Sequence, residues 1–102
     1  MVHEVTNLSA VRNGNCVLDF YTTTCAPCKA LHPVLEEISD EFKDVTVGRV
    51  EVTKNPVLSQ AFGIMSVPTV MVLQNGKIKE VSRGFHNKTT LVSMIRKVLS
   101  GS

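Results

Sequence analysis

The chain has 102 residues, of which 43 % are apolar and 20 % charged. A chain of this length buries roughly 60–70 % of its unfolded surface, so a core forms without metal or disulfide staples. We therefore expect one domain over residues 1–102. Eleven basic and nine acidic side chains give a net charge of +2, which does not favour nucleic acid as a partner. No apolar run approaches the roughly 20 residues of a membrane helix.

The first seven residues lack the basic segment and following apolar segment of a secretory signal. Three cysteines are also too few, and odd in number, for a disulfide scaffold. We therefore expect a cytoplasmic protein that is monomeric and does not contact a membrane.

The first half of the chain predicts strand, short helix, strand and long helix. Residues 2–5 form an edge-strand candidate and residues 7–11 a short helix. Residues 16–21 are nearly all apolar, as in a strand covered on both faces. From residue 27 to residue 42, apolar positions recur at spacings of three and four, the pattern of an amphipathic helix. Those positions are Leu31, Leu35, Ile38 and Phe42.

The second half predicts a strand at residues 45–52 and a short helix at residues 55–62, with Asn at the N-cap and Pro at the first helical position. Strands at residues 69–73 and 78–82 flank an Asn-Gly pair, the strongest short hairpin signal. A closing amphipathic helix is marked by Leu91, Ile95, Val98 and Leu99. This order predicts a three-layer α/β fold, with a mixed sheet of four or five strands flanked by four helices.

The segment Cys25-Ala26-Pro27-Cys28 follows a predicted buried strand and opens the long helix. A helix N-terminus favours thiolate over thiol, and cysteines in such pairs have pKa values of roughly 3.5–7.5 rather than about 8.5. The thiolate is the nucleophile of disulfide exchange. Two intervening residues allow the second thiol to attack a mixed disulfide made by the first. We predict that Cys25 attacks and Cys28 resolves.

Two other interpretations of the cysteine pair stay open at this point, half of a zinc site and a purely structural pair. Zinc needs four ligands, and the remaining candidates are Cys16 and three histidines without a second pair at ligand spacing. A structural pair does not require a position between strand and helix. Redox chemistry without metal or bound cofactor is therefore favoured, and we expect Cys16 to pack as a small apolar side chain.

Over nearly its whole length the chain resembles the thioredoxin family. The matching segments are Asp19-Phe20-Tyr21, Cys25-Ala26-Pro27-Cys28-Lys29, Pro33, Asn55-Pro56, Phe62-Gly63-Ile64, Ser66-Val67-Pro68-Thr69 and Asn75-Gly76-Lys77. The resemblance implies the thioredoxin fold and reduction of protein disulfides through a Cys25/Cys28 cycle. It also implies thioredoxin reductase as electron donor. The alternatives are an oxidant-type disulfide exchanger and a thioredoxin-fold adaptor with idle cysteines.

Asp19 lies in the middle of an apolar strand, where an unpaired carboxylate is costly and has a raised pKa. The alternative is a water-exposed carboxylate at a strand end. The resemblance implies that Asp19 lies behind the cysteine pair and is the general base for Cys28. Arg49 shares a predicted strand face with two valines. It either meets Asp19 and favours its ionised form, or lies at the surface with its stem along the sheet.

The resemblance also implies a substrate-binding rim. Thioredoxins have a cis proline at the position of Pro68, and Val67 before it offers backbone groups to an extended substrate. Gly84 would permit close approach of a substrate backbone. The alternatives are an ordinary strand-entry proline and a simple turn glycine.

Thr24, Ala26 and Pro27 complete the expected rim around the cysteine pair. The family usually has Trp immediately before the first cysteine and Gly after it, whereas this chain has Thr24 and Ala26 and no Trp at all. We therefore expect the apolar surface available for partner docking to be smaller in this chain than in family members that carry the Trp.

Overall fold

The computed structural model describes residues 1–101. The elements are β1 (Val2–Glu4), the 3₁₀ helix η1 (Leu8–Val11), β2 (Asn15–Tyr21), α1 (Ala26–Glu41), β3 (Val45–Glu51), α2 (Pro56–Ala61), β4 (Thr69–Gln74), β5 (Lys77–Arg83) and α3 (Lys88–Leu99). The predicted order of strands and helices is confirmed. Within these residues no helix has the length and apolar character needed to cross a bilayer.

The expectation of four helices needs one correction, because the first helix is a single 3₁₀ turn of four residues. Asn7 caps it by accepting a hydrogen bond from the Ser9 backbone N–H at 3.0 Å. Gly14, with a φ of +76°, follows shortly after and turns the chain into β2. A segment this short closes i→i+3 bonds more readily than a full α-helical turn. The described residues therefore contain three α-helices.

The five strands form one mixed sheet in the order β1-β3-β2-β4-β5. Strands β1, β3 and β2 run parallel, while β4 and β5 are antiparallel to their neighbours. The parallel pair β2 and β3 requires a crossover, which α1 supplies. The hairpin between β4 and β5 turns at Asn75 and Gly76, which both have positive φ, as a type I′ turn requires. The predicted hairpin is confirmed.

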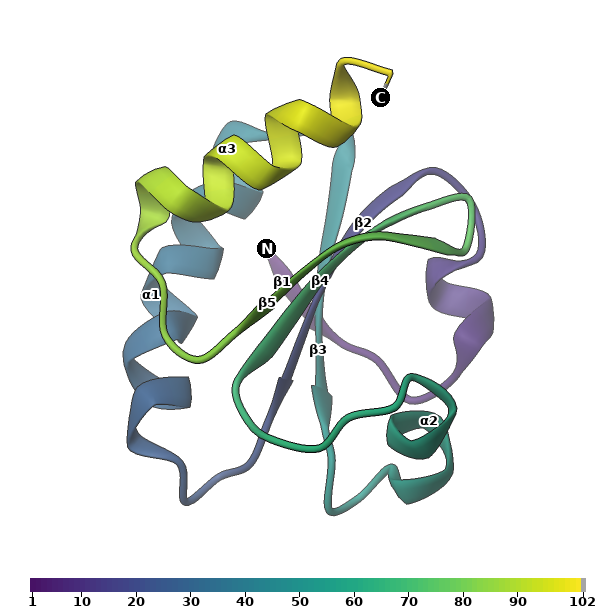
Figure 1. Ribbon diagram of the computed structural model, residues 1–102, viewed down its shortest axis with the longest axis vertical. Helices are drawn as coiled ribbons and strands as arrows, with labels where there is room; N and C mark the ends of the chain where they lie inside the picture. The colour runs from purple at the N-terminus through teal and green to yellow at the C-terminus, as the bar shows by residue number, and fades with distance from the viewer. Residues whose placement is uncertain (102) are drawn as a thin grey trace.

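Helices cover both faces of the sheet, so that the molecule has three layers (Figure 1). Helices α1 and α3 pack on one face through a cluster that includes Val17, Val47, Leu35 and Ile95. The short elements η1 and α2 pack on the other face through a second cluster. That cluster includes Cys16, Leu18, Phe20, Val50 and Leu58. Alternate residues of β2 enter the two clusters, which explains why its sequence is apolar on both faces.

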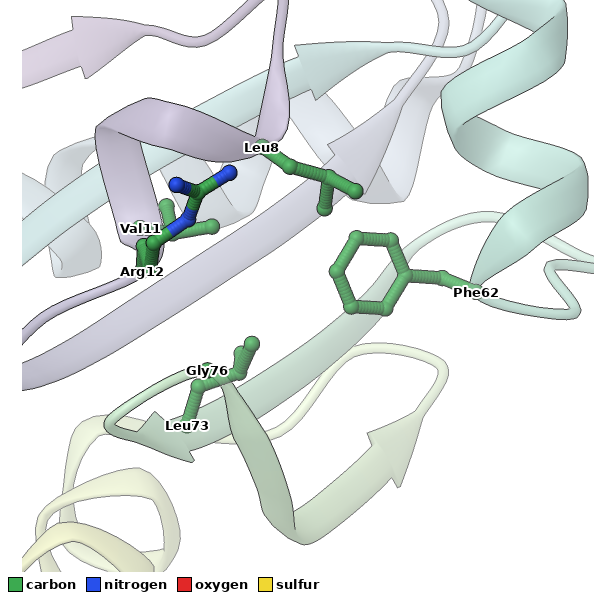
Figure 2. Close-up of a pocket in the computed structure, with 6 residues that line it drawn as sticks. All are labelled: Leu8, Val11, Arg12, Phe62, Leu73 and Gly76. Carbon is green, nitrogen blue, oxygen red and sulfur yellow. The ribbon is translucent and has the colours of Figure 1, made fainter.

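A pocket of about 180 Å³ opens on the η1–α2 face (Figure 2). Its lining is formed by Leu8, Val11, Arg12, Phe62, Leu73 and Gly76. None of the predicted site residues lines this pocket, because Asp19 and the cysteine-bearing helix belong to the opposite face of the sheet.

Candidate active site

A disulfide joins Cys25 and Cys28 at the N-terminus of α1, with their Cα atoms 5.2 Å apart. Cys25 is the N-cap residue, and its Sγ accepts a hydrogen bond from the Cys28 backbone N–H at 3.2 Å. The two sulfurs differ in access, because Cys25 is partly exposed while Cys28 is fully buried. An incoming molecule can therefore reach Cys25 but not Cys28.

The turn between the two cysteines is compatible with a helix start. Pro27 lies in the first turn of α1, where its missing N–H leaves no helical hydrogen bond unmade. The N-terminal backbone N–H groups of the helix carry a partial positive charge. Because the Cys28 N–H points at the Cys25 sulfur, this charge stabilises negative charge there. Thr24, Ala26 and Pro27 are all exposed around that sulfur.

Asp19 lies in the middle of β2 and is fully buried. Its partner is Arg49 in β3, which stands directly opposite it in the parallel register. The Arg49 Nε donates to the Asp19 Oδ2 at 2.9 Å, and only 8 % of the Arg49 side chain is exposed. The exposed-carboxylate and surface-arginine alternatives are both wrong.

Burial raises the pKa of Asp19 to about 6, although the hydrogen bond and charge of Arg49 act in the opposite direction. A carboxyl with this pKa is ionised in most molecules at neutral pH, yet gains a proton more readily than a surface carboxylate. The second carboxylate oxygen, Oδ1, is buried and has no hydrogen-bond partner among residues 1–101. That oxygen is free to accept a proton.

Arg49 also reaches the cysteine helix. Its Nη2 donates to the Cys28 backbone carbonyl at 3.4 Å, and its guanidinium lies 3.7 Å above the centre of the Tyr21 ring. The Tyr21 hydroxyl in turn donates to the Glu4 Oε1 at 2.9 Å. Burial and the neighbouring Glu4 carboxylate raise the pKa of Tyr21 to about 12.

The sequence alone does not single out Glu4 and Tyr21 as members of the group that contacts Arg49. Tyr21 lies two residues after Asp19, so strand alternation alone places both on one sheet face. Glu4 carries no such signal. It joins the group because β1 pairs with β3 in a register that sets Glu4 opposite Arg49.

The Val67–Pro68 peptide bond is cis, as the resemblance implied. The next residue, Thr69, pairs with Phe20 near the C-terminal end of β2. The cis segment therefore lies at the end of the sheet where the chain leaves β2 and continues to the cysteines (Figure 1). Gly84 has a φ of +83°, and its N–H donates to the Pro68 carbonyl at 2.8 Å. A left-handed backbone of this kind favours glycine, and nothing lies within 4 Å of where a Cβ would stand.

Comparisons with known proteins agree with this geometry. The thioredoxin family model matches residues 3–97. A thioredoxin from Rickettsia bellii is 38 % identical over 80 residues, which are 78 % of this chain and 76 % of the relative. A thioredoxin from Bacillus subtilis is 37 % identical over 87 residues, which are 84 % of either chain.

Among solved structures, a mutant thioredoxin from Halobacterium salinarum superposes with a TM-score of 0.88 at 27 % identity. The superposition covers 94 % of this chain and 88 % of the other. The fold expected from the resemblance is thereby confirmed. The chain belongs to the thioredoxin family and is a thiol–disulfide oxidoreductase acting on protein disulfides.

Proposed function

We propose that this protein is a cytoplasmic reductant of protein disulfides, in which Cys25 attacks, Cys28 resolves and Asp19 is the proton acceptor. The observation that carries the proposal is the unequal access of the two sulfurs. Cys25 caps α1 at the surface, whereas Cys28 is buried in the same helix, whose backbone is linked through Arg49 to Asp19.

The cycle begins with the Cys25 thiolate attacking one sulfur of a substrate disulfide. This forms a mixed disulfide and releases the other substrate sulfur as a thiolate. Cys28 then loses its proton toward Asp19, and its thiolate attacks the Cys25 sulfur. The Cys25–Cys28 disulfide forms, and the second substrate sulfur leaves and takes up a proton. The substrate gains two electrons from the cysteine pair, and a thioredoxin reductase then supplies two further electrons that reduce the Cys25–Cys28 disulfide.

Asp19 suits the role of general base because of its protonation range. With a pKa of about 6 it is mostly ionised at neutral pH and can accept the Cys28 proton. Its unpartnered Oδ1 provides the acceptor atom. The other oxygen is already engaged by Arg49.

The substrate would lie across the exposed Thr24, Ala26 and Pro27 and against the cis segment formed by Val67 and Pro68. No backbone hydrogen bond within residues 1–101 engages Val67, so its N–H and C=O can pair with an extended substrate strand. Gly84 leaves open space beside this segment. The proposal includes residues 1–102 acting as one monomeric domain.

The test compares three single variants for insulin-disulfide reduction and for covalent capture of a disulfide-containing protein. Cys25→Ser should lose both activities, because no attacking thiolate remains. Cys28→Ser should lose turnover but accumulate mixed disulfides, because resolution is lost. Cys16→Ala is the matched control, since Cys16 is buried on the other face of the sheet and should leave both activities unchanged.

Capture by Cys25→Ser but not by Cys28→Ser would show that the two roles are inverted. Wild-type protein that binds partners without reducing insulin would instead support the adaptor alternative. A redox potential well above that of protein-reducing relatives would support an oxidant.

A further inference from the structure

The pocket on the η1–α2 face has no role in the redox cycle, because the cysteine-bearing helix covers the other face of the sheet. We propose that this pocket binds a small molecule that carries a single apolar ring and a carboxylate. The ring would lie against the apolar walls, and the carboxylate would pair with Arg12 at the rim. The inference goes beyond disulfide reduction and does not depend on it.

The walls of the pocket are apolar and come from three separate parts of the chain. Leu8 and Val11 belong to η1, and residues three apart lie on the same side of a 3₁₀ helix. Leu73 of β4 is fully buried, and Phe62 directly follows α2. Their side chains surround a common space in Figure 2. Because apolar surface is stabilised when it leaves water, these walls favour an apolar ligand body.

The walls are held in place by contacts that need no ligand. The Phe62 ring packs against the Phe20 ring with their centroids 5.5 Å apart. The hairpin turn is tied to the loop before β2 by two hydrogen bonds. The Asn75 N–H donates to the Gly14 carbonyl at 2.9 Å, and the Gly14 N–H donates to the Asn75 Oδ1 at 2.9 Å. These bonds hold the adjacent Gly76 at the rim, so the pocket is formed before a ligand enters.

The charged side chain of the rim is Arg12, the C-cap residue of η1. It is exposed, and its guanidinium extends toward Leu8 (Figure 2). Within residues 1–101 Arg12 forms no ion pair, and no acidic side chain lines the pocket. The guanidinium fork matches the two oxygens of a carboxylate. A single cation balances the one negative charge of a carboxylate, whereas a phosphate monoester carries roughly two at neutral pH.

The volume of the pocket, about 180 Å³, limits the apolar body to one ring. An apolar cavity of roughly 150 Å³ engineered into another protein binds benzene. A second ring would therefore extend into water, and a folded protein surface would not enter. Because the walls and the guanidinium line the same small pocket, the carboxylate must lie only a few bonds from the ring. A suitable probe is 3-phenylpropionate.

The experiment titrates the whole chain, in its disulfide form, with 3-phenylpropionate and follows the backbone amides by ¹H–¹⁵N NMR. Saturable shifts should centre on residues 8–12 and 73–76, with a dissociation constant on the order of 1 mM or below. The amides of residues 24–28 should stay unchanged. The neutral analogue 3-phenylpropionamide has the same ring without the charge, and it should bind at least about fivefold more weakly.

Two variants separate the charge from the apolar walls. Arg12→Gln should weaken the binding of 3-phenylpropionate about tenfold, while the binding of the amide changes less than about twofold. Lys79→Gln removes an exposed charge from β5 of the same hairpin and is the matched control, which should bind both probes as wild type does. Leu8→Ala should weaken both probes about threefold, because both use that wall.

The three substituted side chains are exposed, so the amide spectrum of each variant away from the pocket should match that of wild type. The inference is wrong if no saturable shift occurs around the pocket up to about 20 mM probe, or if the shifts centre on residues 24–28. Equal binding of the acid and the amide, or undiminished binding of the acid to Arg12→Gln, would contradict the carboxylate assignment.

A last arm separates a small molecule from the end of a protein chain. A tetrapeptide that ends in phenylalanine has the same ring and carboxylate at the same separation, with a chain attached. It should bind no more tightly than 3-phenylpropionate. Tighter binding of the peptide would show that the pocket receives a chain terminus, and it would overturn the proposal of a small-molecule ligand.

Discussion

Asp19 is an ionisable side chain buried in the core, so the free energy of unfolding should depend on pH through its protonation. Its pKa is raised from 3.8 to about 6 in the folded state, chiefly by burial. The folded protein therefore binds the proton more tightly than the unfolded chain. The stabilisation from protonated Asp19 is complete below about pH 4 and is lost as the pH rises through about 6.

Asp19→Asn should consequently gain stability relative to wild type as the pH rises from 4 to 7, by roughly 2–3 kcal/mol. Arg49 loses its partner in this variant, but it stays charged throughout, so that loss adds a constant offset. Urea unfolding of the disulfide form across this pH range measures the difference. Asp40→Asn, an exposed carboxylate on α1, controls for the loss of one charge. A difference that does not vary with pH would contradict the prediction.

Arg49 shows what residue-level inference from the sequence could and could not decide. Alternation in the strand placed Arg49 on a face with two valines, and that much is confirmed by their shared core face. Whether the side chain ends in the core or at the surface depends on which residue stands opposite in β2. That residue is 30 positions away in the sequence, and no local pattern specifies the register.

At the scale of elements, the three α-helices begin in different ways. Asn87 caps α3 with its side chain, accepting from the Thr90 backbone N–H at 3.0 Å. Asn55 precedes α2 as predicted, but its side chain makes no cap and donates instead to the Glu51 carbonyl at 2.9 Å. Cys25 caps α1 with its sulfur. The N-cap position was therefore predictable for α2, whereas the side-chain bond was not.

Asn87→Ala should lower the free energy of unfolding by about 1 kcal/mol, because it leaves the Thr90 N–H without its partner. Helix α3 packs on the sheet through Leu91, Ile95 and Val98, so weakening this helix lowers the free energy of unfolding of the whole domain. Thr89→Ala, at an exposed position on the same turn, is the control and should change stability little. Equal losses in the two variants, measured by urea unfolding, would mean that the cap does not contribute.

At the scale of the molecule, we expect the exposed rim around Cys25 to influence which partners dock. Thr24 is exposed immediately before Cys25, at the position where the family usually carries Trp. An aromatic anchor in an interface contributes about 2 kcal/mol or more when it is buried by a partner. This protein lacks that anchor.

Thr24→Trp should therefore lower the Michaelis constant with a thioredoxin reductase whose docking depends on the Trp. Reduction of a small disulfide by the pre-reduced variant should barely change, because a small substrate needs the Cys25 thiolate but little docking surface. Steady-state reductase kinetics on both proteins provide the measurement. Wild-type protein that couples as well as a Trp-bearing thioredoxin would show that the missing Trp does not set specificity.

The sequence by itself determined the order of the elements and the place of the reactive pair. Periodicity of apolar residues and turn chemistry are local signals, and they located β2, the start of α1 and the Asn75-Gly76 hairpin. The one element described wrongly, residues 8–11, is too short for periodicity to distinguish an α-helical turn from a 3₁₀ turn.

Only the tertiary structure decided the surroundings of Asp19. Its contacts with Arg49, and through Arg49 with Tyr21 and Cys28, join three separate elements. These contacts depend on strand order and register, which follow from packing both sheet faces at once and not from any one segment. The same packing buries Cys28 and leaves Cys25 at the surface, so the difference between two chemically identical thiols arises from the fold.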